Sequence, residues 1–288
     1  MPIITSLQNP RVKEAVRLRD RRHREKQGRI LIDGARELRR AIGGGLRMIE
    51  VFVCEPLCLG DEAKRLLQSL DSCGGEVLSI NETVFEKLAF GHRAEGVLGV
   101  AEMPMPELST LDLPSWGGNS TATPTSASGS SVAAPTVDNT LIAVLEGVEK
   151  PGNVGAVIRS ADAAGISAVI LADARTDLYN PNAIRASLGT IFSMRVCAAA
   201  SGDVLAWLRL HQMRIYTARV DGSVPYTSVQ YRGPTAIVLG SEATGLSPVW
   251  KGPDIKAIRL PMLGKADSLN VSATAAVLFY EALRQRSS

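Results

Sequence analysis

The stretch Ile258–Arg286, IRLPMLGKADSLNVSATAAVLFYEALRQR, decides the fold of the second half of the chain. Its first residues, 258–260, form a short β-like run closed by Pro261, and residues 262–267 form a loop that contains a glycine. We expect a long helix to open at Ser268, because apolar residues then recur at helical spacing. A strand that feeds a helix through a polar loop is where α/β proteins place ligands. The stretch is therefore a candidate binding site.

Small hydrogen-bonding side chains gather where this helix is expected to begin. Ser268, Asn270 and Ser272 alternate with apolar residues over the predicted first turns. The first turn of a helix carries backbone N–H groups that have no partner within the helix. Polar side chains at this place indicate a polar site rather than packing alone.

Composition sets wide limits on the class of protein. The chain has 288 residues, of which 45% are hydrophobic, and a formal net charge of +3. This length is enough for a sizeable core and suggests two domains. No apolar run reaches the ~18 residues of a membrane-spanning helix, and MPIITSLQNPRVKE lacks the apolar region of a signal peptide. We therefore expect no membrane partner.

The cysteines do not form a recognisable framework. Cys54, Cys58, Cys73 and Cys197 are too few for a disulfide scaffold in a chain of this length. Cys54 and Cys58 lack the second pair or the histidines of a zinc site. We expect reduced, partly buried thiols, no metal, and a reducing cytoplasmic location.

The N-terminal segment is strongly basic. Residues 5–30 are predicted to form a helix with Pro10 at its start and an apolar face through Val12 and Leu18. The charged residues around that face are mostly of one sign: Arg11, Lys13, Arg17, Arg19, Arg21, Arg22, Arg24, Lys26 and Arg29. A solvated helix face is the simple interpretation, but the density of arginine favours contact with nucleic acid.

Strands and helices alternate after this segment, which predicts a small α/β domain over about 28–103. Together with the basic segment, the first domain is expected to cover 1–103. The expected strands are 30–32, 49–54, 75–80 and 96–101, and the expected helices are 34–42, 62–72 and 82–88. Residues 104–138 are rich in proline, serine and threonine, so we expect a flexible linker there, at least from 115 to 137.

The second predicted domain covers 139–288 and has the pattern of a parallel sheet. Its expected strands are 141–145, 168–171, 192–197, 215–220, 235–239 and 256–260, and its expected helices include 156–164 and 204–210. Three loops, 153–159, 240–247 and 261–272, are expected to follow strand ends and converge on one crevice. That crevice would gather Asn153, Arg159, Glu242, Ser268 and Asn270, which suits a ligand with many polar groups and a phosphate for the arginine.

Familiar nucleotide-binding patterns are missing from these loops. Neither GxGxxG nor GxxxxGK[ST] occurs in the chain. The three histidines, His23, His92 and His211, are scattered and suggest no catalytic triad. The residues alone therefore predict a site but leave the ligand open.

Three segments, in order, resemble the motifs of a known family. NVGAVIRSADAAG, IVLGSEATGLS and IRLPMLGKADSLNVSATAAVLFYEAL look like the first, second and third motifs of the SpoU (TrmH-type) RNA 2′-O-ribose methyltransferases of the SPOUT superfamily. The resemblance covers about 139–286. ITSLQNPRVKE and ILIDGARELRRAI resemble the ribosomal-protein-like RNA-binding domain that often precedes this catalytic domain.

The resemblance implies a C-terminal domain with a deep trefoil knot around the third motif, which forms an S-adenosylmethionine pocket. By position in the motifs, Gly240, Leu260 and Leu269 correspond to cofactor-binding residues. The positions that match the family's catalytic set are Arg159, Asn153, Glu242, Ser268 and Asn270. The resemblance also implies a homodimer through the catalytic domain.

The same resemblance guides the expectation for RNA. DLYNPNAIRASLGTIF, residues 177–192, is similar to a family segment on the substrate side. Together with the basic N-terminal segment it yields a set of candidate RNA contacts: Arg17, Arg21, Arg22, Arg24 and Arg185. The chain departs from the family at Arg195, where many members carry proline, and in its long linker.

The predicted function is S-adenosylmethionine-dependent methylation of a ribose 2′-hydroxyl, in large-subunit (23S) ribosomal RNA. Two alternatives stay open at this point. One is the same reaction on transfer RNA, and the other is a non-catalytic RNA-binding factor for ribosome assembly.

Overall fold

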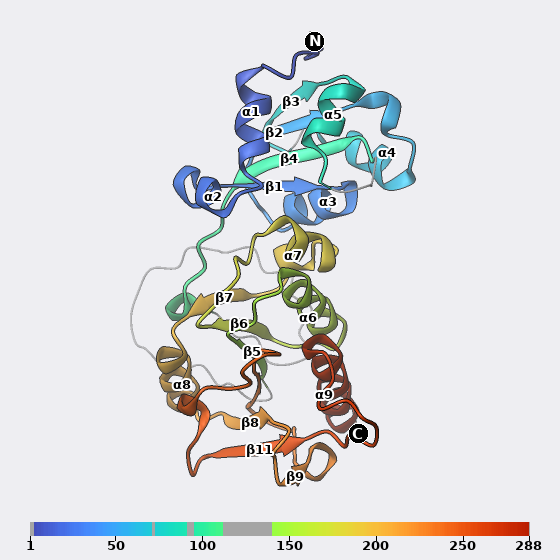
Figure 1. Cartoon of the computed structure of the whole chain (residues 1–288). Coiled ribbons are helices and arrows are strands. Elements are labelled where there is room, and N and C mark those ends of the chain that lie inside the picture. The colour runs from blue at the N-terminus through green and yellow to red at the C-terminus, as the bar shows by residue number, and fades with distance from the viewer. Residues whose placement is uncertain (1–2, 71–72, 91–94, 112–139, 288) are drawn as a thin grey trace, which may run out of the picture. The chain divides into compact units, whose positions relative to one another are not determined.

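The computed structural model describes residues 3–70, 73–90, 95–111 and 140–287. Contacts between Cα atoms divide the chain into two compact units (Figure 1). The first unit comprises Met1–Met105, Lys150–Arg159 and Thr176–Ser193, and the second comprises Pro106–Glu149, Ser160–Arg175 and Met194–Ser288. The domain limits expected at 103 and 139 remain a prediction, and residues 112–138 of the expected linker lie outside the described residues.

The first unit contains a four-stranded mixed sheet with the order β1-β4-β2-β3. Its strands are β1 (Arg29–Asp33), β2 (Met48–Val53), β3 (Glu76–Ser79) and β4 (Val97–Glu102). Strand β4 runs antiparallel to β1 and β2, whereas β2 and β3 are parallel.

Helices cover both faces of this sheet (Figure 1). Helices α1 (Pro10–Arg17) and α5 (Glu82–Leu88) pack in one core cluster with Phe52 and Leu98. Helix α3 (Ala35–Gly43) lies on the other face, where a Cβ at Gly99 would come within 2.3 Å of the Leu38 side chain. Helix α4 (Asp61–Leu67) packs against α3. The predicted α/β class is confirmed for this unit.

The basic segment is not one helix over 5–30. It forms α1 and a second helix, α2 (Arg21–Gln27), because Asp20 interrupts the chain between them in an extended conformation. The Asp20 carboxylate accepts a hydrogen bond from the backbone N–H of Arg22 at 2.8 Å and so caps α2. Gly28 ends α2 with a positive φ of 61°, which a glycine adopts without strain.

The second unit contains a seven-stranded sheet with the order β7-β6-β5-β10-β8-β11-β9. All of its strand pairs are parallel, as predicted. The strands are β5 (Leu141–Glu146), β6 (Ala168–Ala172), β7 (Val196–Ala199), β8 (Arg214–Ala218), β9 (Val224–Pro225), β10 (Thr235–Leu239) and β11 (Ile255–Arg259). Strand β9, with two residues, was not predicted.

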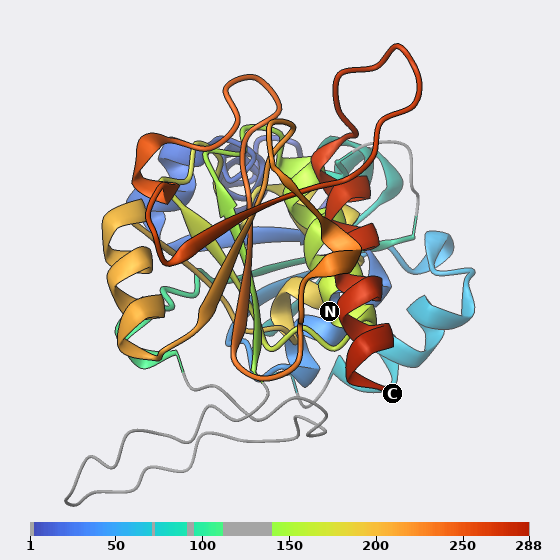
Figure 2. The same cartoon turned by 90° about the horizontal axis from the view of Figure 1, so that it is seen from below.

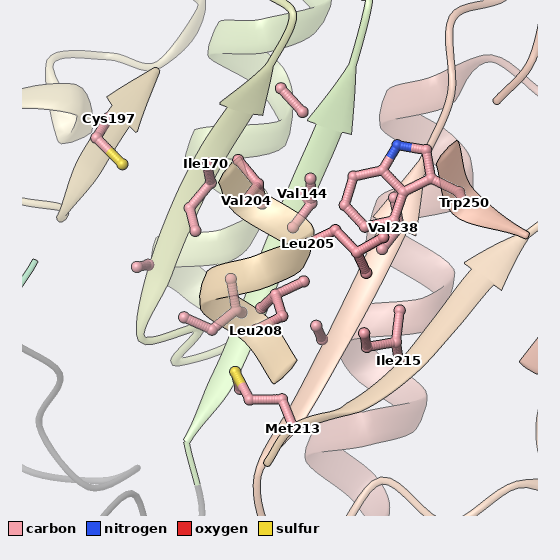
Figure 3. Close-up of a cluster of buried hydrophobic side chains, with 14 residues drawn as sticks. Val144, Ile170, Cys197, Val204, Leu205, Leu208, Met213, Ile215, Val238 and Trp250 are labelled. Carbon is pink, nitrogen blue, oxygen red and sulfur yellow. The ribbon is translucent and has the colours of Figure 1, made fainter. Parts of the chain in front are cut away.

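The continuous apolar strands of this sheet are buried on both faces. On one face, α8 (Ser201–Leu210) packs over Val144, Ile170 and Val238, and Trp250 completes the cluster (Figure 3). On the other face lies α9 (Val271–Arg286), which contacts β10 (Figures 1 and 2). This double coverage explains why the strands have apolar runs rather than alternating patterns.

Several boundaries differ from the expected ones, and those near the predicted site matter most. Helix α6 begins at Pro151, five residues before the expected start at 156, and runs to Ala163, so residues 153–155 are helical as well. Proline suits the first position of a helix, because that position needs no N–H donor. Phe192 lies in a 3-10 turn, and β7 starts only at Val196.

Helix α9 begins three residues later than expected, at Val271. Asn270 is its N-cap and accepts the Ser272 backbone N–H at 2.9 Å, so Ser268 lies in the preceding loop. Helix α7 (Pro181–Ala186) is a short helix with Asn180 as N-cap. Among the helices that the structure describes, none has both the length and the apolar character needed to cross a membrane.

Candidate functional site

A pocket of about 520 Å³ lies in the second unit, where β8, β10 and β11 end. Its volume is in the range of sites for small molecules. Its lining comes from three segments that follow parallel neighbouring strands: Ala218–Asp221, Leu239–Leu246, and Leu260, Met262, Asp267, Ser268, Leu269, Val271 and Thr274. The pocket thus lies at the carboxyl edge of the sheet, and residues of 240–247 and 261–272, two of the three loops expected there, line it.

The first wall of the pocket is the segment Gly240–Ser247, which we call the β10 loop. Its backbone folds back on itself, because Ser241 N–H donates to the Gly245 carbonyl at 3.2 Å and Gly245 N–H donates to the Ser241 carbonyl at 3.0 Å. The Ser241 hydroxyl accepts the Thr244 N–H at 3.1 Å. The loop is therefore held by its own hydrogen bonds.

Gly240 is required by this geometry. A Cβ atom at position 240 would lie 2.3 Å from the Gly245 carbonyl carbon and 2.6 Å from the Leu246 nitrogen, both backbone atoms that cannot swing away. Gly245 has φ +66°, which favours glycine as well. The two glycines let the loop fold back closely on its own backbone.

The second wall is the segment Leu260–Asn270, which we call the β11 loop. It is much more exposed, with Leu269 at 42% and Leu263 at 98% of the possible side-chain exposure. Leu260 is half-buried, whereas Ser268 and Asn270 are exposed. Asn270 ends the loop as the cap of α9, with its carboxamide oxygen also 2.6 Å from the Ser272 hydroxyl. The pocket thus has apolar side chains and exposed polar groups on the same wall.

The structure brings most of the predicted cofactor and catalytic positions of the second unit together. Gly240, Leu260 and Leu269 all line the pocket, and so do Glu242 and Ser268. Asn270 lies in the sequence between Leu269 and Val271, which both line the pocket.

Asn153 and Arg159 lie on α6, in the part of that helix that belongs to the first unit. Arg159 is exposed, and no carboxylate of the described residues forms an ion pair with it. Asn153 is half-buried in the first turns of the helix.

The predicted RNA contacts divide into exposed and buried arginines. Arg17 and Arg21 have about half of their side chains exposed (54% each) and pair with Glu14 and Glu25 on their own helices. Arg22 is exposed. Arg185 has 22% of its side chain exposed and lies 3.7 Å from the Asp33 carboxylate.

Arg24 departs from this expectation, because only 1% of it is exposed. Its guanidinium donates to the Asp177 carboxylate at 2.7 Å and to the carbonyls of Leu18 and Arg19 at 2.7 and 2.8 Å. Arg24 therefore stabilises the bend between α1 and α2, and its burial leaves no donor for a phosphate. A charge pattern alone cannot distinguish such a residue from its exposed neighbours.

Sequence reasoning missed the segment after β8. Arg219 and Asp221 line the pocket, and the Arg219 guanidinium donates two hydrogen bonds of 2.8 Å to the Asp221 carboxylate. These bonds hold the pKa of Asp221 below its ordinary value. The sequence could have indicated this segment through β8, because a strand that runs parallel to β10 ends at the same edge of the sheet.

The cysteines carry no site of their own. All four are free and buried, and burial raises the pKa of Cys58 and of Cys197 to about 11. Across the described ranges, no group of His, Cys, Asp and Glu side chains is arranged to hold a metal ion.

Comparison with known proteins identifies the family to which this chain is related. The model of the SpoU rRNA Methylase family matches residues 140–280, and that of the MRM3-like substrate binding domain matches residues 9–99. The 23S rRNA (guanosine-2′-O-)-methyltransferase RlmB of Photorhabdus laumondii is 30% identical over 84% of this chain and 92% of its own.

Two solved structures show the same fold. An RNA 2′-O ribose methyltransferase has a TM-score of 0.80 and 38% identity, with both chains covered completely (100%). The AdoMet-bound rRNA methyltransferase from Sinorhizobium meliloti has a TM-score of 0.81 and 26% identity over 98% of this chain and 97% of that one.

Proposed function

This chain belongs to the SpoU rRNA methylase family, and we propose that it transfers a methyl group from S-adenosylmethionine to a ribose 2′-hydroxyl of 23S ribosomal RNA. The observation that carries the proposal is the pocket at the ends of β8, β10 and β11, which gathers the cofactor positions Gly240, Leu260 and Leu269. The Photorhabdus laumondii relative is named as a methyltransferase of 23S rRNA, and the model of a substrate-binding domain matches residues 9–99 of this chain.

The pocket suits S-adenosylmethionine on its own chemistry. The cofactor combines an apolar-faced purine with a ribose and an amino acid, so it needs both apolar walls and polar groups. Leu260 and Leu269 supply apolar surface, and the backbone of Gly240 and of its loop supplies polar groups to the lining. When bound, the cofactor supplies the methyl group.

Arg159 is proposed to act on the RNA side of the reaction. A guanidinium stays protonated at neutral pH and is therefore a poor base. Its exposed position suits binding of a substrate phosphate and stabilisation of negative charge on the 2′-oxygen. Ser268 and Asn270 would orient the ribose, Asn153 would support Arg159, and Glu242 would orient the loops.

The test is methylation of isolated RNA. The protein is incubated with labelled S-adenosylmethionine and with 23S or transfer RNA, and the methylated ribose is mapped. We expect label in 23S RNA; label in transfer RNA alone would overturn the proposed substrate. No cofactor binding in calorimetry together with tight RNA binding would favour the assembly factor.

A variant separates the role of Arg159 from that of the pocket. We expect Arg159→Ala to lower kcat at least ~100-fold, as for loss of a group that stabilises the transition state, with an unchanged Kd for the cofactor. Arg209→Ala is the matched control, because Arg209 is 48% exposed, is paired with Asp254 and does not line the pocket. Normal turnover by Arg159→Ala would contradict the assignment.

Three finer features complete the proposal. A trefoil knot around the third motif is proposed from the resemblance of that motif to the family; the sheet order, with β8 between β10 and β11, is compatible with it. A homodimer is supported by the exposed apolar side chains Leu263, Val277 and Tyr280 on the β11 loop and α9. A cytoplasmic location is supported by the proposed ribosomal RNA substrate.

A further inference from the structure

Glu146, the last residue of β5, is a buried acidic residue that the proposed reaction does not use. Only 4% of it is exposed. Burying a carboxylate is costly unless hydrogen bonds compensate for the lost water. Glu146 has such bonds: Oε1 accepts from the hydroxyls of Ser247 at 2.6 Å and Ser201 at 2.9 Å, and Oε2 accepts from the Ser247 backbone N–H at 2.7 Å.

Two of these three hydrogen bonds come from the end of the β10 loop. Ser247 is its last residue and precedes the 3-10 turn Pro248–Trp250. Trp250 in that turn is 1% exposed and is packed in the core cluster (Figure 3). The loop is thus tied down at its end by a side chain from β5.

The start of the loop is tied to the same strand. Strands β5 and β10 are parallel neighbours, and Leu239, which precedes the loop, pairs with Leu145. Glu146 follows Leu145 directly, so consecutive residues of β5 hold both ends of the β10 loop. The third hydrogen bond to Glu146 comes from the hydroxyl of Ser201, the first residue of α8. The backbone N–H of Ser201 donates to the Asp173 carboxylate at 3.1 Å.

We propose that Glu146 is a positioning residue for the cofactor: its carboxylate holds Ser247 so that the β10 loop keeps the shape of a pocket wall. This rests on the proposed function, because the wall matters only if the pocket binds S-adenosylmethionine. Glu146 is not among the residues that line the pocket, whereas Gly240–Leu246 are. It acts on the pocket through Ser247, the residue that follows the lining residue Leu246.

Two substitutions distinguish positioning from general support of the core. In Glu146→Ala the Ser247 N–H loses its acceptor and the loop end is released. In Glu146→Gln the amide oxygen still accepts the Ser247 N–H, and the amide NH₂ donates to the two serine hydroxyls, which can accept. Glu146→Gln should therefore keep most of the loop rigidity and cofactor affinity that Glu146→Ala loses.

The first measurement is hydrogen exchange of the full chain without cofactor. We expect amides of 240–247 to exchange faster in Glu146→Ala, and at close to the wild-type rate in Glu146→Gln. Glu149→Ala is the matched control, because Glu149 is 55% exposed and pairs with Arg175 at 2.7 Å. Wild-type exchange in a folded Glu146→Ala protein would overturn the proposal.

The second measurement is the affinity for S-adenosylmethionine. We expect Glu146→Ala to raise its Kd and its KM about tenfold, the order expected for loss of a hydrogen bond to a charged group. The KM for RNA should stay unchanged, and Glu146→Gln should stay within about threefold of wild type. An equal rise in both KM values would show general destabilisation instead.

Two further outcomes keep the proposals separate. If the wild type binds no S-adenosylmethionine, the proposed function fails, and the exchange measurement still decides whether Glu146 holds the loop. If Glu146→Ala does not fold, Ser247→Ala and Ser201→Ala replace it. Ser247→Ala must then weaken cofactor binding more than Ser201→Ala, and the reverse order would overturn the proposal.

Discussion

The β10 loop and the β11 loop line the same pocket but are built in opposite ways. The β10 loop is closed by hydrogen bonds between Ser241 and Gly245 and is anchored by the buried Glu146. The β11 loop projects outward, with Leu263 at 98% and Leu269 at 42% exposure. One wall is thus formed before any ligand arrives, and the other is not packed against the body of its unit.

This difference suggests that the two loops have different roles in binding. Loops with few buried apolar contacts open at little cost in free energy, whereas tightly bonded loops do not. We expect the β10 loop to fix where the cofactor lies, and the β11 loop to become ordered by the cofactor, the RNA or a second protomer. Four substitutions test this comparison.

Gly240→Ala should have the largest effect. Its Cβ would meet the Gly245 backbone at 2.3 Å, so the β10 loop must move, at a cost of about 1–3 kcal/mol as in overpacked cores. We expect the Kd for S-adenosylmethionine in calorimetry to rise more than ~10-fold.

The matched control for that substitution is in the other wall. A Cβ at Gly264 would meet no atom within 4 Å. Gly264→Ala should therefore bind the cofactor like the wild type. Equal losses in both variants would mean that the two walls are equally rigid.

Ser241→Ala should have the next largest effect. It removes the acceptor of the Thr244 N–H at 3.1 Å and the hydroxyl contact to Thr244 at 2.8 Å. A hydrogen bond contributes about 1 kcal/mol, so the Kd for the cofactor should rise about fivefold. An unchanged Kd would show that the loop is held by Glu146 and its backbone bonds alone.

Asn270→Ala should act on stability as well as on the reaction. It removes the cap of α9, whose loss costs about 1 kcal/mol. We expect the Tm to fall by about 2–4 °C in a thermal melt. Asn270→Asp keeps the cap and should keep the Tm, so a fall in kcat for this variant would reveal the catalytic role separately.

Leu263→Ser should leave the fold and the Tm of the monomer unchanged, because the side chain is 98% exposed. If the β11 loop is covered by a second protomer, sedimentation should show weaker self-association. Association equal to that of the wild type would place the dimer contact elsewhere.

Spacing of residues predicted much of the sheet and of the pocket. The ends of parallel strands meet at one edge, so Gly240, Leu260 and Ser268 could be expected together although they are distant in sequence. The identity of the cofactor came from the resemblance of the motifs, because spacing alone left the ligand open. Helix boundaries were less accurate, since capping by Asp20 and Asn270 depends on local backbone conformation.

The sequence by itself determined the α/β class, the parallel sheet, the family and the candidate residues, because apolar periodicity and motifs are local properties of the chain. Only the tertiary structure decided which charged side chains are buried. Arg24 and Glu146 are ordinary charged residues in sequence, yet each lies in the interior and bonds to segments far along the chain. Such roles depend on the partners that folding brings within hydrogen-bonding distance.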